Sequence, residues 1–205
     1  MAAEVLRVDP VAPEARVLDE AARVLRAGGL VAFPTESFYG LGAAALEPTA
    51  VRRVFEAKGR PASMPLLVVI DAPAMLAEIV ADVPERARAL MARHWPGPLT
   101  LVFRAAPRVP AEVTAGTGTI GVRVPAHPVP RGLAARLGTP VTAPSANPTG
   151  GAPPVTAAAV QALLGGALDL VLDGGPTPGG APSTVVDVTV DPPRVIRQGA
   201  ITLIL

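Results

Sequence analysis

The chain has 205 residues, a formal net charge of +1 at pH 7 and hydrophobic side chains at 50% of its positions, which predicts a single folded domain over residues 1–205. The absence of cysteine excludes disulfide scaffolds, thiolate metal sites and a cysteine nucleophile, and two histidines are too few for a histidine-rich metal site. The near-neutral charge argues against a protein that coats nucleic acid. Since no apolar run approaches the roughly 18 residues of a membrane helix, we expect a soluble, cytoplasmic protein without a membrane partner.

The hydrophobic pattern predicts short helices interspersed with short strands. An amphipathic helix over 13–27 is followed by an apolar strand over 30–33, and the polar segment from Thr35 to Gly42 is predicted to be a functional loop. Further helices are predicted over 48–57, 73–80, 84–93, 128–137 and 156–164, and further strands over 66–70, 99–104, 119–124, 140–143, 168–172, 184–190 and 194–197. Strands and helices do not alternate strictly. The predicted fold class is therefore α/β, with a twisted mixed parallel and antiparallel sheet and flanking helices.

Common nucleotide-binding and hydrolase motifs do not fit. Residues 116–121, GTGTIG, have the letters of a dinucleotide-binding GxGxxG motif, but residues 120–124 are themselves strand-like, whereas that motif opens a helix. Neither a GxxxxGK[ST] P-loop nor a GxSxG nucleophile elbow occurs in the chain. The P-loop class is excluded on these grounds, the pattern argues against the Rossmann class, and Ser145 does not lie in a nucleophile elbow.

Polar residue types that are rare in this chain gather in connections rich in glycine and proline. They are the only lysine, asparagine and tyrosine and all four serines, namely Lys58, Asn147, Tyr39, Ser37, Ser63, Ser145 and Ser183. One interpretation is ordinary turn chemistry, because polar residues favour turns. The other is that these positions need an ammonium, an amide or a hydroxyl to hold a ligand. We place Lys58 in an exposed turn.

Three separated groups of cations accompany these polar residues. They are Lys58 with Arg60, then Arg123, then Arg197. Arg123 and Arg197 taken singly are equally compatible with surface charges on strands. Together with hydroxyls, amides and turn N–H groups, however, the three groups suit a polyanion and a small zwitterion. A nucleoside triphosphate and an amino acid have this chemistry.

The chain also carries six segments in the order found in YrdC-type threonylcarbamoyl-AMP synthases, which it resembles over residues 14–201. They are PTESFYGLG, KGRP followed by PLLVVI, HWPGPLT, TIGVRVP, APSANPTGG, and PSTVVD followed by RQGAI. The resemblance implies ATP-dependent joining of L-threonine and bicarbonate or CO₂ into L-threonylcarbamoyl-AMP, with release of pyrophosphate, for threonylcarbamoyladenosine in tRNA. It further implies Mg²⁺ carried with ATP, a downstream tRNA threonylcarbamoyl transferase as partner, and possible contact with tRNA.

The resemblance also implies roles for individual residues. Threonine is expected to contact Ser37, Arg123 and Ser183. Lys58 and Arg60 are expected to act catalytically on the ATP phosphates. The expected ATP site consists of Lys58, Arg60, Thr119, Ser145, Asn147 and Arg197, with no metal ligand from the protein.

The sequence departs from the family at Met64 and Val69, where many members have asparagine and histidine. The chain ends just after the synthase segments, so it is similar to the short members of the family. Two alternatives stay open: an RNA-binding module with a concave basic groove, and a carbamoyl-transfer domain that acts on another acceptor. One lysine and six aromatic residues give little capacity for base stacking or phosphate tracking, which favours the enzyme.

Overall fold

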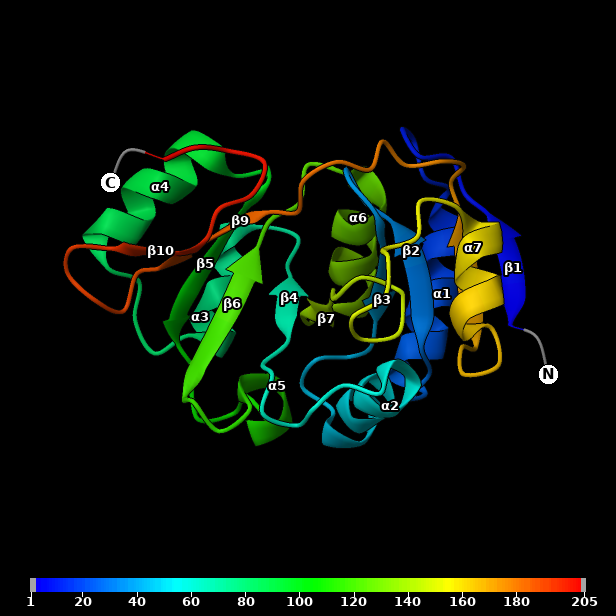
Figure 1. Cartoon of the computed structure of the whole chain (residues 1–205), viewed down its shortest axis with the longest axis horizontal. Helices are drawn as coiled ribbons and strands as arrows, with labels where there is room; N and C mark the ends of the chain where they lie inside the picture. The colour runs from blue at the N-terminus through cyan, green and yellow to red at the C-terminus, as the bar shows by residue number, and fades with distance from the viewer. Residues whose placement is uncertain (1–2, 204–205) are drawn as a thin grey trace.

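In the computed structural model, which describes residues 3–203, the strands form two hydrogen-bonded sheets (Figure 1). The four-stranded sheet has the order β1-β8-β2-β3, with β1 at Glu4–Arg7, β2 at Val31–Pro34, β3 at Tyr39–Gly42 and β8 at Leu170–Asp173. The six-stranded sheet has the order β10-β9-β5-β6-β4-β7. Its strands are β4 Leu67–Val69, β5 Leu99–Arg104, β6 Thr119–Arg123, β7 Val141–Thr142, β9 Thr184–Asp187 and β10 Arg194–Arg197.

Both sheets mix parallel and antiparallel pairs, which confirms the predicted α/β class. In the four-stranded sheet β1 and β2 run parallel to β8, while β3 runs antiparallel to β2. In the six-stranded sheet the pairs β5·β9 and β4·β6 are parallel, and the other three pairs are antiparallel. The division into two sheets was not predicted. The prediction of one domain over 1–205 stays a prediction.

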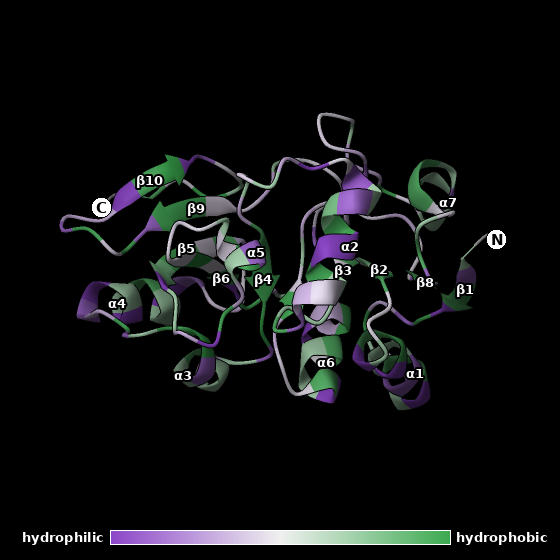
Figure 2. Ribbon diagram, turned by 90° about the horizontal axis from the view of Figure 1, so that it is seen from below, coloured by the Kyte–Doolittle hydropathy of each residue, from purple (hydrophilic) through white to green (hydrophobic). Residues whose placement is uncertain are grey.

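The helices cover the sheets. They are α1 Ala15–Arg26, α2 Pro48–Lys58, α3 Leu76–Ile79, α4 Glu85–His94, α5 Ala111–Thr114, α6 Pro128–Leu137 and α7 Ala157–Leu164, and a 3₁₀ turn over Pro73–Met75 precedes α3. Figure 2 shows α1 and α6 on one face of the four-stranded sheet and α7 on the other. The α1 face with Val17, Leu18 and Leu25 is buried against α6 and the sheet, as its spacing predicts. Within residues 3–203, no helix is both long enough and apolar enough to cross a membrane.

The two sheets meet where β3 lies beside residues 140–146, a junction that we call the seam. Backbone hydrogen bonds join the two segments there: Thr142 N donates to Ala43 O at 3.0 Å, and Leu41 N donates to Pro144 O at 2.8 Å. Ala146 N donates to Tyr39 O, also at 2.8 Å. The seam therefore holds the edge strand β3 of the four-stranded sheet against the edge strand β7 of the six-stranded sheet.

The prediction of a loop from Thr35 to Gly42 is wrong in its second half, which forms β3. Gly40 and Gly42 both lie against the ring of Phe33 on the neighbouring strand, and a Cβ atom would come within 2.8 and 2.7 Å of ring carbons. The glycines are therefore needed for close packing in a strand rather than for a turn. Tyr39 is fully buried, and its hydroxyl donates to Gly175 O at 2.7 Å.

Two short elements were missed by the sequence analysis, β1 and α5. Strand β1 pairs in parallel with β8, with Glu4 opposite Leu170, so its partner lies far along the chain. Helix α5 has only four residues, which is too short for a periodic pattern. The predicted strand over 184–190 ends at Asp187, whose Oδ1 accepts from Thr189 N at 2.9 Å and turns the chain.

Candidate active site

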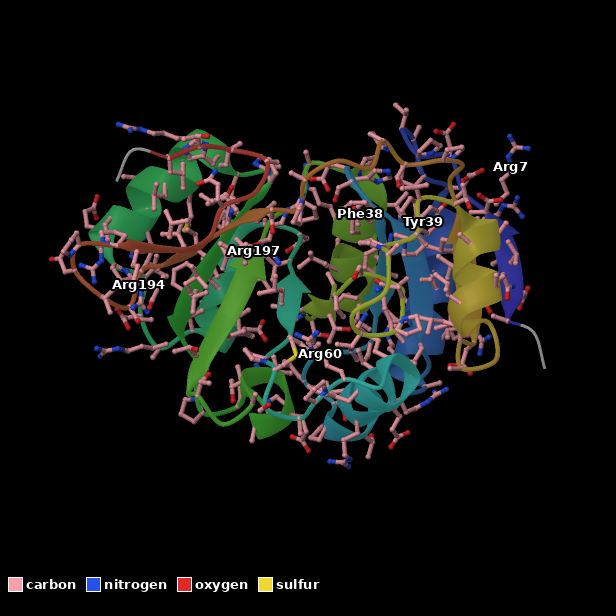
Figure 3. The ribbon with its side chains drawn as sticks, in the orientation of Figure 1. Arg7, Phe38, Tyr39, Arg60, Arg194 and Arg197 are labelled. Atoms are coloured by element: carbon pink, nitrogen blue, oxygen red, sulfur yellow. The ribbon has the colours of Figure 1, made fainter. Side chains whose placement is uncertain are left out.

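A cavity of about 500 Å³ opens at the seam. Strands β4 and β6 run parallel, with Val69 opposite Arg123, so their carboxyl ends reach the cavity together. The volume lies within the range of small-molecule pockets, roughly 300–1,000 Å³. Arg197 from the six-stranded sheet and Phe38 from beside the four-stranded sheet both line it, and Figure 3 shows them on opposite sides of the seam.

The turn between β2 and β3 is fixed by the hydroxyl of Thr35. This hydroxyl donates to Phe38 O at 2.6 Å and accepts from the N–H groups of Ser37 and Phe38 at 3.2 and 3.3 Å. A threonine side chain can replace backbone partners in this way at a turn. The turn therefore presents Glu36 and Ser37 to the cavity in a defined conformation.

Arg123 is held by two partners at the end of β6. Its Nε donates to Gly97 O at 2.8 Å, and its Nη2 lies 2.5 Å from Glu36 Oε1. Glu36 Oε1 also accepts from Ala126 N at 2.6 Å. Within residues 3–203 the Nη1 group of Arg123 has no protein acceptor. The guanidinium is thus oriented by the protein and keeps donor capacity for a ligand.

The charge of Glu36 is set by Arg123. Burial opposes ionisation of the carboxyl, but the charge of Arg123 and hydrogen bonds from backbone N–H groups outweigh burial, so the pKa of Glu36 lies below 4.5. Glu36 is therefore a carboxylate at neutral pH. The sequence analysis missed this residue, although it is the only acidic side chain between Pro34 and Gly42.

On the opposite wall, Arg197 and Ser183 bond to each other. Arg197 Nη2 donates to Ser183 O at 2.9 Å and to Ser183 Oγ at 3.3 Å. Ser183 Oγ also lies 2.8 Å from Thr100 Oγ1, a partner that the sequence analysis missed. The register of β10 against β9 shifts between Val195 and Arg197, and such bulges redirect side chains.

The cavity carries a net positive charge. Its charged lining residues are Arg123, Arg197 and Glu36, two cations and one anion. Burial, and then the charge of Arg123, lowers the pKa of Arg197, which indicates that the two guanidinium groups repel each other. An anionic ligand relieves this repulsion, so the cavity favours a carboxylate or a phosphate.

The structure brings some of the predicted site residues together in this cavity and not others. Ser37, Arg123, Ser145, Ser183 and Arg197 line it, whereas Lys58, Arg60, Thr119 and Asn147 do not. Of the two departures from the family pattern, Val69 lines the cavity, and Met64 is exposed outside it. The individual ligand contacts assigned to all of these residues stay predictions.

The expectation that Lys58 lies in an exposed turn is wrong. Lys58 is the last residue of α2 and only 3% exposed, and its Nζ donates to Ser145 O and Asn147 O at 2.5 Å each. Thr149 N donates back to Lys58 O at 2.8 Å, and Asn147 Nδ2 donates to Gly151 O, also at 2.8 Å. A lysine with a buried stem thus holds the loop that contributes Ser145 to the cavity.

Arg60 and Thr119 lie away from the cavity lining. Arg60 donates through Nε to Met64 O at 3.1 Å and through Nη2 to Pro65 O at 2.8 Å. Thr119 begins β6, four residues before Arg123, and its hydroxyl lies 2.9 Å from that of Thr117. At about 3.3 Å per strand residue, these two ends of β6 are roughly 13 Å apart. A ligand that reaches both must be extended.

The stability of the protein should depend on pH through Lys58. Burial, and then the charge of Arg60, lowers the pKa of Lys58 from 10.5 to about 8. Between these two pH values the unfolded chain binds more protons than the folded protein, so stability rises with pH. We expect the unfolding free energy of the wild type to gain about 1.4 kcal/mol per pH unit in this window relative to Lys58→Met. Urea unfolding of both proteins at several pH values measures this difference, and a constant difference would contradict the pKa shift.

Residues 3–203 contain no cluster of three or more histidine, cysteine, aspartate or glutamate side chains that could hold a metal ion. The polar side chains that line the cavity instead carry hydroxyl and guanidinium groups and a single carboxylate. Guanidinium groups bind anions and cannot ligate a metal ion. The lining therefore suits an anionic ligand.

The fold and the cavity define an α/β protein with a net positively charged cavity at a seam between two mixed sheets. The chain belongs to the Sua5/YciO/YrdC family, whose family model, described as telomere recombination, matches residues 23–199. This confirms the family resemblance found in the sequence.

Individual relatives are similar over most of the chain. The chain is 45% identical over 183 residues to the threonylcarbamoyl-AMP synthase of Pyrococcus abyssi, covering 89% of this chain and 54% of that protein. It is 44% identical over 184 residues to that of Bacillus subtilis, covering 89% and 53%. The crystal structure of P. abyssi Sua5 complexed with L-threonine aligns with a TM-score of 0.91 and 43% identity, covering 95% of this chain and 57% of that one. The chain spans about half the length of these curated relatives.

Proposed function

We propose that the protein joins L-threonine, bicarbonate or CO₂, and ATP into L-threonylcarbamoyl-AMP with release of pyrophosphate. The observation that carries the proposal is the close match of the whole fold to a family member crystallised with L-threonine. The net positive cavity at the seam supports it, because both substrates bring anionic groups.

In this proposal the amino acid binds at the carboxyl end of β6. The Nη1 group of Arg123 receives the threonine carboxylate, which a guanidinium binds with better geometry than an ammonium. Ser183 and Ser37, on opposite walls of the cavity, are the candidates for the threonine hydroxyl. Val69 adds an apolar surface beside them.

ATP is proposed to extend from this point along Ser145 and Arg197. The neutral threonine amine forms a carbamate with bicarbonate, with loss of water, or with CO₂, with loss of a proton. A carbamate oxygen then attacks the α-phosphorus as the bond from this phosphorus to pyrophosphate breaks. The protein mainly positions the reactants and neutralises charge. Lys58 and Arg60, which lie outside the cavity lining, are proposed to act on the phosphates from beside it, and Mg²⁺ carried with ATP would add positive charge there. Asn147 and Thr119 complete the proposed nucleotide contacts.

The product is a mixed carbamic–phosphoric anhydride, which is reactive toward amines. We propose that a tRNA threonylcarbamoyl transferase consumes it to modify adenosine in tRNA, in the cytoplasm where these substrates meet.

Pyrophosphate release tests the reaction class. ATP is incubated with the protein in the presence and absence of L-threonine and bicarbonate, and pyrophosphate is measured over time. The proposal predicts release that needs both co-substrates. Release that is independent of threonine would contradict it.

Amino-acid selectivity tests the two serines. If Ser37 or Ser183 bonds the threonine hydroxyl, valine should react at least about 100-fold less efficiently than threonine, because it leaves a polar group of the site unpaired. Serine lacks only the methyl group, worth roughly 1 kcal/mol, and should be the better alternative substrate. The values of kcat/KM for the three amino acids measure this order, and equal values for valine and threonine would refute the assignment.

A further inference from the structure

One oxygen of Glu36 has no partner in the protein. Oε1 accepts from Arg123 Nη2 and Ala126 N, whereas Oε2 is buried and has no hydrogen-bond donor among residues 3–203. Buried acceptors are nearly always satisfied, so an unpaired one at the wall of a cavity calls for a donor that a ligand brings. Glu36 lines the cavity, so a ligand bound there lies next to this carboxylate.

The surroundings of Glu36 determine which donor fits. Arg123 and Ala126 fix Oε1 from one side, and the turn organised by Thr35 fixes the backbone. With Oε1 held by these two contacts, the second oxygen of the Glu36 carboxylate has no partner in the protein among residues 3–203. This oxygen carries negative charge and best accepts from a cationic N–H group.

Arg123 offers the complementary charge at the same place. Its Nη1 group has no protein acceptor among the described residues, while Nη2 is bound to Glu36. A donor with positive charge and an acceptor with negative charge thus lie side by side on one wall of the cavity. An α-amino acid has the matching pair, a carboxylate and an ammonium on adjacent atoms.

We propose that Glu36 Oε2 accepts a hydrogen bond from the α-ammonium group of the amino-acid substrate, while Arg123 Nη1 binds its carboxylate. This inference rests on the proposed function, since it concerns the amino acid of that reaction. It makes the Glu36–Arg123 pair a selector for zwitterions. Hydroxy acids and other simple carboxylates satisfy Arg123 but leave Glu36 without its donor.

Two ligands distinguish direct binding of the ammonium group by Glu36 from an indirect role in which Glu36 only orients Arg123. L-threonine carries an α-ammonium group. (R)-3-hydroxybutyrate has the same carboxylate and hydroxyl groups but no ammonium group. Binding of each ligand is measured by calorimetry on the wild type and on Glu36→Gln, which keeps the side-chain length and an acceptor for Ala126 N. Glu112→Gln is the matched control, because Glu112 pairs with Arg52 at the surface, outside the cavity.

We expect Glu36→Gln to weaken L-threonine binding about 10- to 100-fold and to change (R)-3-hydroxybutyrate binding less than about 3-fold, as for the loss of one bond to a charged group. An equal loss for both ligands would overturn the proposal, since Glu36 would then act only by orienting Arg123. Tighter binding of both would also overturn it, because Glu36 would then compete with the ligand for Arg123.

The wild type gives a second readout that does not depend on the folding of the variant. L-threonine should bind at least about 10-fold more tightly than (R)-3-hydroxybutyrate, and equal affinities would overturn the proposal. If the wild type binds no L-threonine, the proposed function fails and this inference falls with it. If threonine binds to the wild type and Glu36→Gln alike, only this inference fails.

Discussion

Replacing Arg123 by lysine is expected to raise the L-threonine concentration needed for half-maximal turnover by about 100-fold. Lysine keeps the charge, but it cannot bond Gly97 O, Glu36 and a substrate carboxylate through one planar group as the guanidinium does. ATP binding measured without threonine should change little. Threonine titrations at saturating ATP, and ATP titrations alone, provide both values.

The control for this substitution is Arg194→Lys. Arg194 lies on the edge strand β10, largely exposed, with Asp187 3.6 Å away, and such surface pairs contribute little. We expect wild-type kinetics from this control. An unchanged threonine dependence in Arg123→Lys, or an equal loss for both substrates, would remove Arg123 from the amino-acid site.

Replacing Lys58 by methionine is expected to lower turnover at least about 100-fold while the protein remains folded. Methionine fills similar volume and removes a buried charge, so the fold is retained. The carbonyl groups of Ser145 and Asn147 lose their shared donor, and the loop that lines the cavity loses its fixed position. If the ammonium also stabilises the phosphates, the loss of charge adds to the effect.

Arg52→Met, on the same helix, serves as the control. Its side chain is about half exposed and pairs with Glu112 at the surface. Circular dichroism establishes folding of both variants, and steady-state rates establish activity. Wild-type turnover in a folded Lys58→Met protein would show that neither the lysine charge nor its hold on the loop matters for the reaction.

Local sequence patterns were sufficient to predict most helices and strands. They were insufficient for strands whose form depends on residues elsewhere in the chain. The amphipathic spacing of Val17, Leu18 and Leu25 is enough to predict α1, because the periodicity lies within one segment. Strand β3 is not predicted, because the polar segment that contains it favours a loop, and its glycines are explained only by the ring of Phe33 packed against them. Strand β1 is not predicted, because its partner β8 lies far along the chain.

For the site, motifs indicated which segments converge but not how their side chains bond. Ser37, Arg123 and Ser183 were expected at one site and line one cavity. The burial of Lys58 could not be predicted, because it depends on carbonyl groups from a loop far along the chain. The pairing of Glu36 with Arg123 depends in the same way on the meeting of the β2–β3 turn with the end of β6.

The most direct test of the proposed reaction is mass spectrometry of its product. The protein is incubated with ATP, L-threonine and ¹³C-labelled bicarbonate, and the mixture is compared with reactions that each omit one substrate. We predict a species with the mass of L-threonylcarbamoyl-AMP that carries the label and appears only in the complete mixture. An AMP adduct of threonine without the label, or no adduct while the folded protein binds both ATP and threonine, would contradict the proposed function.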